Sequence, residues 1–253
     1  MNLSYKNDPE LKKIFVAEIV RHRKADQIVQ GTYGENNGIW KGCAVGCSIH
    51  SLNIKLGKNY NTNNHAALAR EILGGEQNEG LARLEDVIFK NLTVEESKLW
   101  PEQFAKAIPV GARLKPVKFA FCAYLMRENI ERVLSLDIDA KLKEQVVDAI
   151  RQVLAVHEGA IRTGIWDKLA AGSARSAAES AKSAAMSAMW SAPESTARSA
   201  RSAAVSAMSA MSAAESAAES AMSAMWSAPE RTANRAAYTR YAQELLRLLK
   251  MAK

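Results

Sequence analysis

Apolar residues recur every three or four positions through residues 1–165, which is the spacing of amphipathic helices. The first such run follows Asp8 and Pro9, an N-cap residue and a proline that fits the first turn, and it places Leu11 and Phe15 on one face. No alternating run typical of a strand reaches a convincing length. The pattern therefore predicts an all-α fold that begins with a multi-helix globular domain over residues 1–165.

The pattern changes towards the C-terminus, where residues 173–227 form a low-complexity tract of Ser, Ala and Met. Its serines, from Ser173 to Ser227, take 15 steps over 54 residues, a mean of about 3.6 that equals the α-helical repeat. A straight helix would therefore place their hydroxyls on one stripe with alanines beside it. Because Ala has the highest helix propensity, we expect the tract to be helical and not a disordered linker.

Two prolines interrupt the repeated part of the chain. The segment MSAMWSAPE occurs at 186–194 and again at 222–230, and in each copy Ser-Ala-Pro-Glu matches a capping box. The serine spacing continues through Pro193 and Pro229, so a kinked continuous helix is the alternative to a break. We favour breaks, which predict that residues 166–253 form a Ser/Ala-rich helical bundle or long helical hairpin with a basic C-terminal helix. The expected antiparallel helices cover 173–190, 192–226 and 228–251.

Small side chains along the tract predict close helix packing, either within the chain or against another molecule. The candidate interaction surface consists of Ser173, Ser187, Trp190, Ser206, Ser220 and Trp226. A purely structural role, in which Ser is a small residue tolerated at a tight helix contact, is the alternative. The tract therefore suggests self-association or binding of a protein partner.

The net charge of +7, from 34 Lys and Arg against 27 Asp and Glu, is concentrated near the C-terminal end of the chain. Residues 228–253 carry six basic and two acidic residues, but no aromatic or Gly-rich basic cluster accompanies them. A basic end can complement the dipole of its own helix. Nucleic-acid binding through this helix is therefore not expected and stays a second alternative.

Other features of the sequence concern the compartment. No apolar run approaches the roughly 18 residues that a membrane span needs. The start, MNLSYKNDPELKK, lacks the apolar core of a signal peptide. Three cysteines, an odd number, fit a reducing compartment better than a disulfide scaffold. We expect a cytoplasmic protein without a membrane segment.

Cysteine and histidine are concentrated in one region. On a helix, Cys43, Cys47 and His50 would share a face, and with His65 they could bind zinc, whose preferred ligands include thiolate and imidazole. The same residue types would allow a cysteine nucleophile with a histidine base. The alternative is structural, because Cys beside closely spaced glycines behaves as a small buried apolar residue.

A pocket could lie next to these residues. The spacing of acidic and histidine side chains places three of them on one face of the first helix, and the glycine-rich loop that follows could form a rim. The candidate pocket residues are Glu18, His22, Asp26, Tyr33, Trp40 and Lys41. An enzyme or a small-ligand site within residues 18–65 is therefore the main alternative to a non-enzymatic protein.

Three stretches, GTYGENNGIWKGCAVGCSIHS, LARLEDVIFKNL and KLWPEQFAKAIPVGA, together resemble an uncharacterised group of bacterial and phage proteins that pair such a helical region with an Ala-rich repetitive tail. The resemblance covers most of the chain. It implies no activity and no site residues. The sequence as a whole favours a non-enzymatic helical protein for protein-protein interaction or assembly.

Overall fold

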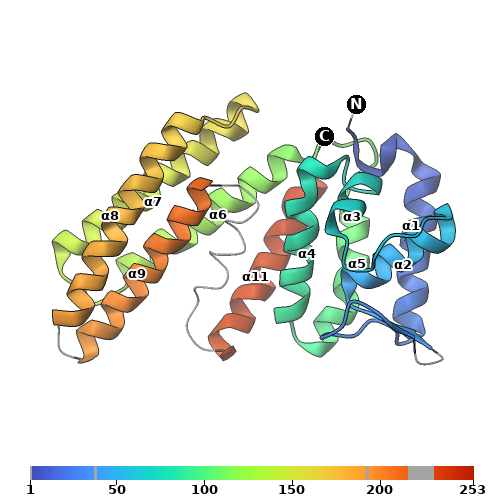
Figure 1. The fold of residues 1–253 in the computed structure, drawn as a ribbon, viewed down its shortest axis with the longest axis horizontal. Coiled ribbons are helices and arrows are strands. Elements are labelled where there is room, and N and C mark those ends of the chain that lie inside the picture. Colours follow the sequence, from blue (N-terminus) through green and yellow to red (C-terminus); the bar gives the residue numbers. More distant parts are fainter. Residues whose placement is uncertain (1, 37–38, 192–193, 216–230) are drawn as a thin grey trace. The chain divides into compact units, whose positions relative to one another are not determined.

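The computed structural model describes residues 2–36, 39–191, 194–215 and 231–253 (Figure 1). These residues are mainly helical. Their strands form one short antiparallel pair, β1 (Glu35–Asn36) and β2 (Trp40–Lys41), and an isolated bridge joins Ile28 and Gly42. The predicted all-α fold class is confirmed.

Contacts divide the chain into two compact units. The first unit combines Met1–Val117 with Arg231–Lys253, and the second unit is Lys118–Glu230. This division differs from the boundary expected between residues 165 and 166. Helix α7 (Ala140–Thr163) packs on the Ser/Ala helices, because their alanines cover its apolar face. Helix α11 (Arg231–Lys250) instead packs in the first unit.

The first unit contains short helical turns and longer helices in sequence order. They are η1 (Ser4–Asn7), α1 (Pro9–Lys24), α2 (Ala44–Leu56), α3 (His65–Glu71), η2 (Glu76–Asn78), α4 (Glu79–Asn91), α5 (Val94–Ala107) and α11. Helix α6 (Lys115–Leu134) begins at the division between the units.

Several helices begin where the sequence signals them. Asp8 caps α1 by accepting a backbone N–H at 2.8 Å, with Pro9 in the first turn. Thr93 and Glu96 form a capping box at the start of α5. Asp139 caps α7 through its side-chain oxygen. These starts fix where each apolar face begins.

The core of the first unit is built around large aromatic side chains. Trp100 and Tyr5 are fully buried, and each satisfies its polar atom with a backbone carbonyl. The Trp100 indole N–H donates to Glu85 at 3.0 Å, and the Tyr5 hydroxyl donates to Ala105 at 2.7 Å. The core thus joins η1, α4 and α5.

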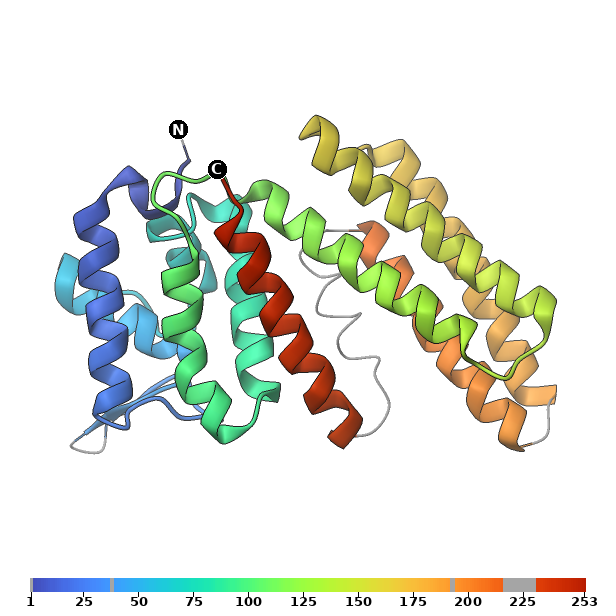
Figure 2. The same cartoon turned by 180° about the vertical axis from the view of Figure 1, so that it is seen from behind.

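Helix α11 completes this unit by packing against α4 and α5 (Figure 2). Leu245 and Leu249 are fully buried. The Thr239 hydroxyl donates to Glu96 Oε1 at 3.0 Å, which links α11 to the capping box of α5. A segment far from the rest of the unit in sequence is therefore part of its core.

The second unit contains all of α7, α8 (Lys168–Ser191) and α9 (Glu194–Glu215), together with most of α6. Helix α8 runs antiparallel to α7 and to α9, and it packs against both (Figure 1). The first two helices expected in the tract, 173–190 and 192–226, correspond to α8 and α9, which pack against each other. Pro193, Pro229 and the second MSAMWSAPE segment lie outside the described residues. Within the described parts of the chain, no helix is both long and apolar enough to cross a membrane.

Candidate functional site

The expected acidic and histidine face of the first helix is only partly formed. Helix α1 ends at Lys24, and Asp26 has a left-handed backbone with φ of 50°, so the prediction that Asp26 continues the face is wrong. Asp26 is exposed and pairs with Lys98 at 2.6 Å. The chain leaves the helical path two residues earlier than the spacing required.

Glu18 remains on α1 and is buried, but it has partners of its own. Arg21 Nε lies 2.9 Å from one carboxylate oxygen and Lys55 Nζ lies 3.0 Å from the other. Burial raises the pKa of Glu18, but the hydrogen bonds from Arg21 and Lys55 outweigh it and lower the pKa overall. Glu18 is therefore an ionised group that links α1 to α2.

His22 lies at the centre of a cluster between α1 and α2. Its Nδ1–H donates to Gln27 Oε1 at 2.7 Å, because an amide oxygen can only accept. Its Nε2 lies 3.1 Å from the Ser51 hydroxyl. Burial lowers the pKa of His22 to about 4, so the ring is neutral near pH 7.

His50 extends this cluster towards solvent. Its Nδ1 lies 3.5 Å from His22 Nε2, and its ring stacks on Trp40 with centroids 4.1 Å apart and an interplanar angle of 6°. Trp40 thereby anchors the loop before α2. Lys41, the next residue, is exposed. The structure brings together His22, His50 and Trp40, of which His50 was expected at a metal site.

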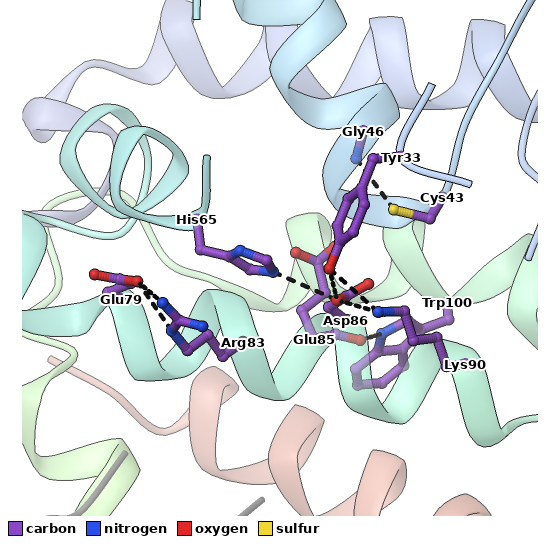
Figure 3. Close-up of polar contacts among 10 residues, drawn as sticks. All are labelled: Tyr33, Cys43, Gly46, His65, Glu79, Arg83, Glu85, Asp86, Lys90 and Trp100. Carbon is purple, nitrogen blue, oxygen red and sulfur yellow. Dashed lines mark hydrogen bonds and ion pairs between the residues drawn. The ribbon is translucent and has the colours of Figure 1, made fainter. Parts of the chain in front are cut away.

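A second cluster lies on the other side of this loop, where Tyr33 reaches α4 (Figure 3). The Tyr33 hydroxyl donates to Asp86 Oδ2 at 2.9 Å. Lys90 Nζ and His65 Nε2 lie 2.7 Å and 3.4 Å from the same oxygen. Burial raises the pKa of Asp86, but the hydrogen bonds from His65, Lys90 and Tyr33 lower it overall. Asp86 is therefore an ionised anchor for three elements.

A glycine in α2, Gly46, lets the loop that carries Tyr33 approach this helix closely. A Cβ built on Gly46 would lie 1.8 Å from the Tyr33 carbonyl oxygen, so no other residue fits there without movement. The N–H of Cys43 donates to the Thr32 carbonyl at 2.7 Å. Gly46 thus allows close contact between this loop and helix α2.

The two cysteines of this region are buried and protonated. Helix α2 begins one residue after Cys43, whose sulfur caps it by accepting the Gly46 N–H at 3.4 Å. The Cys47 thiol donates to the Gly42 carbonyl at 3.4 Å. Burial raises the pKa of both thiols to about 12. This protonation disfavours a cysteine nucleophile.

The four residues expected at a zinc site have separate surroundings. Cys43 and Cys47 contact backbone groups, His50 contacts the Trp40 ring, and His65 contacts Asp86. Across the described ranges, no group of three or more His, Cys, Asp and Glu side chains is arranged to hold a metal ion.

Glu85, like Asp86, is a polar residue that the sequence did not single out. It is buried beside Asp86, and Oε2 has no hydrogen-bond partner within the described structure. Burial and the charge of Asp86 raise its pKa well above the usual value. The signal was the position of Glu85 within LARLEDVIF, one residue after Leu84 and three before Ile88, both of which are buried.

The serine surface of the second unit is divided between two environments. Ser173, Ser187 and Trp190 of α8 are exposed, whereas Ser206 of α9 is fully buried and lies 3.3 Å from Arg132 Nη2. Ser220 and Trp226 lie outside the described residues. Of the candidate interaction residues that the structure describes, those on α8 remain accessible.

The fold and these clusters define an all-α protein of two units, with polar anchors in the first and alanine-packed helices in the second. No family model, no curated protein and no solved structure matches the chain. Its resemblance to the bacterial and phage group stays a prediction.

Proposed function

We propose that this protein is a non-enzymatic assembly protein that self-associates through the outer face of α8. The outer face is a row with alternating spacings of four and three residues. It consists of Leu169, Ser173, Ser176, Ser180, Ser183, Ser187 and Trp190. The opposite face carries the alanines that are buried against α7 and α9.

The observation that carries the proposal is the exposure of a large apolar side chain at each end of this row. Leu169 is 86% exposed and Trp190 is 80% exposed. The serines between them are exposed as well, and they are small enough to let another helix approach closely. We infer that these two side chains act as anchors at the two ends of the face.

Helix α9 supplies a precedent within the same chain. It is made of the same repeat, and its Ser206 and Ser209 are fully buried by neighbouring helices. A serine-bearing face of this repeat is therefore compatible with close helix packing. We infer that the outer face of α8 packs in a similar way when a second copy covers it.

The arrangement of residues on α8 suits an antiparallel pair with a two-fold axis near Ser180. Leu169 and Trp190 are 21 residues apart, about 31 Å along a helix, and lie at nearly equal distances from Ser180. The axis would bring Leu169 of each copy to Trp190 of the other.

The polar clusters of the first unit support a structural role there. His22, Asp86 and Glu18 are held by neighbouring side chains, and both thiols of the region remain protonated. Buried free thiols, including Cys122, also suit a reducing compartment, and we propose a cytoplasmic location.

The test is the mass of the full chain in solution, measured by sedimentation equilibrium over a range of concentrations. We expect a monomer-dimer equilibrium that Trp190→Ser shifts towards monomer by about tenfold in dissociation constant, because truncating an anchor costs more than 1 kcal/mol. The control is Ile54→Ser, which alters a side chain on α2 that is 55% exposed. A chain that is monomeric throughout, or an equal effect of both substitutions, would contradict the proposal.

A further inference from the structure

A groove of about 850 Å³ lies at the corner where α7 leads into α8. Its floor is formed by Val156 and Ala160 of α7, both buried. Trp166, in the turn between the helices, and Leu169 of α8 form walls. Pockets for small molecules typically have volumes of roughly 300–1,000 Å³ and mainly apolar walls. The groove fits that class in size and in lining.

The aromatic wall is held in place from behind. The Trp166 ring stacks on Phe119, with centroids 5.7 Å apart and an interplanar angle of 9°. Its centroid lies 5.0 Å from that of His157, whose Nε2–H donates to the Ala213 carbonyl at 3.1 Å. Because Trp166 is supported by two rings, it offers a ligand a flat apolar surface that is already ordered.

The space in the groove depends on Gly159. This glycine lines the groove, and a Cβ built on it would meet no atom within 4 Å. A helix-interior glycine costs stability relative to alanine. Here it leaves room beside Val156 and Ala160 that a larger side chain would fill.

Lys168 supplies the charge at the groove. Its neighbour Asp167 is engaged by α8, since Asp167 Oδ1 accepts the N–H groups of Leu169 and Ala170 at 3.0 Å each. Lys168 also lines the groove, and within the part of the chain that the structure describes it pairs with no carboxylate. A ligand with an anionic group would therefore meet an apolar groove with an ammonium group beside it.

We propose that this groove binds a small amphipathic molecule, with an apolar chain or ring system against Trp166 and Val156 and an anionic head beside Lys168. The site goes beyond the assembly role proposed above. Leu169 and Ser173 belong to both surfaces. Gly159 is on α7 and Trp190 is at the far end of α8, so Gly159→Leu and Trp190→Ser test the two proposals separately.

The experiment is a fluorescence titration of the full chain with 8-anilinonaphthalene-1-sulfonate, followed by displacement with decanoate and with decanol. We expect one displaceable site per chain and tighter binding of decanoate than of decanol. Gly159→Leu fills the groove and should weaken binding by about tenfold or more. The matched control is Gly172→Leu, because Gly172 is also a helix glycine with open space around its Cβ position, but it does not line the groove.

Lys168→Gln tests the head group. We expect it to weaken decanoate binding by about two- to fivefold, the range for an exposed ion pair, and to leave decanol binding unchanged. Circular dichroism checks that each variant keeps its helices. Equal affinities of wild type and Gly159→Leu, equal losses in the two glycine variants, or equal effects of Lys168→Gln on decanoate and decanol would overturn the proposal.

Discussion

Helices α8 and α9 are built from one repeat but bury different parts of it. In α8 the inward stripe consists of alanines and the serines face solvent. In α9 both alanines and serines are buried, because α9 packs against α7 and α8 and also approaches Arg132 of α6. A repeat with a period of 3.6 residues therefore specifies a helix with aligned stripes, while the number of neighbouring helices determines which stripes are covered.

The largest expected effect on stability comes from placing a carboxylate on α9, and the same change on α8 should have little effect. Ala207→Glu puts a carboxylate at a fully buried position of α9, and we expect a loss of about 3–5 kcal/mol in the free energy of unfolding. Ser183→Glu puts the same group on the exposed side of α8 and should change it by about 0.5 kcal/mol or less. Urea denaturation followed by circular dichroism measures both. Similar losses in the two variants would contradict the difference in burial.

Acid should weaken the hydrogen bond between His157 of α7 and the Ala213 carbonyl of α9. Burial lowers the pKa of His157 to about 4, and its Nε2–H donates to α9. Because the folded pKa lies below the unfolded value near 6.5, this contribution to stability is present above pH 6.5 and is lost as the pH falls towards 4. The expected loss is on the order of 3 kcal/mol for this group.

His157→Gln provides the matched variant for the pH measurement. Its amide can still donate to the Ala213 carbonyl but does not titrate between pH 6.5 and 4. Urea midpoints measured at several pH values should fall less steeply in the variant than in wild type. An unchanged dependence on pH would assign the acid sensitivity to another group, such as His22 in the first unit.

The smallest effect should be a stabilisation of α8. Gly172 lies in this helix with open space around its Cβ position, and Gly172→Ala should raise the free energy of unfolding by about 0.4–1 kcal/mol. The gain comes from fewer unfolded conformations and a higher helix propensity. Thermal unfolding of the two proteins checks the sign, and a lower transition temperature in the variant would contradict it.

Local signals in the sequence predicted much of the fold. Asp8, Thr93 and Asp139 each begin a helix because a cap and its backbone partners lie within a few residues. The return of α11 to the first unit was not predicted, since the apolar positions Leu245 and Leu249 would fit any core. Element type is a local property, whereas the choice of packing partner is not.

The candidate site shows the same limit. The sequence singled out Tyr33 and His65 separately, but their meeting at Asp86 depends on a contact 53 residues away from Tyr33. Spacing on an assumed helix also misplaced Asp26, because it did not show that the helix ends at Lys24. Such clusters form only when helices pack, so they cannot be derived from one segment at a time.

The position of α11 has a consequence for synthesis on the ribosome. Helix α11 packs on α4 and α5 but follows the whole second unit in the sequence. During synthesis, the N-terminal part of the first unit therefore lacks this packing partner until the second unit has emerged from the ribosome. Vectorial folding from the first residue onward therefore cannot finish the N-terminal unit first. Until then, the apolar surface that α11 later covers is exposed to chaperones and to neighbouring chains.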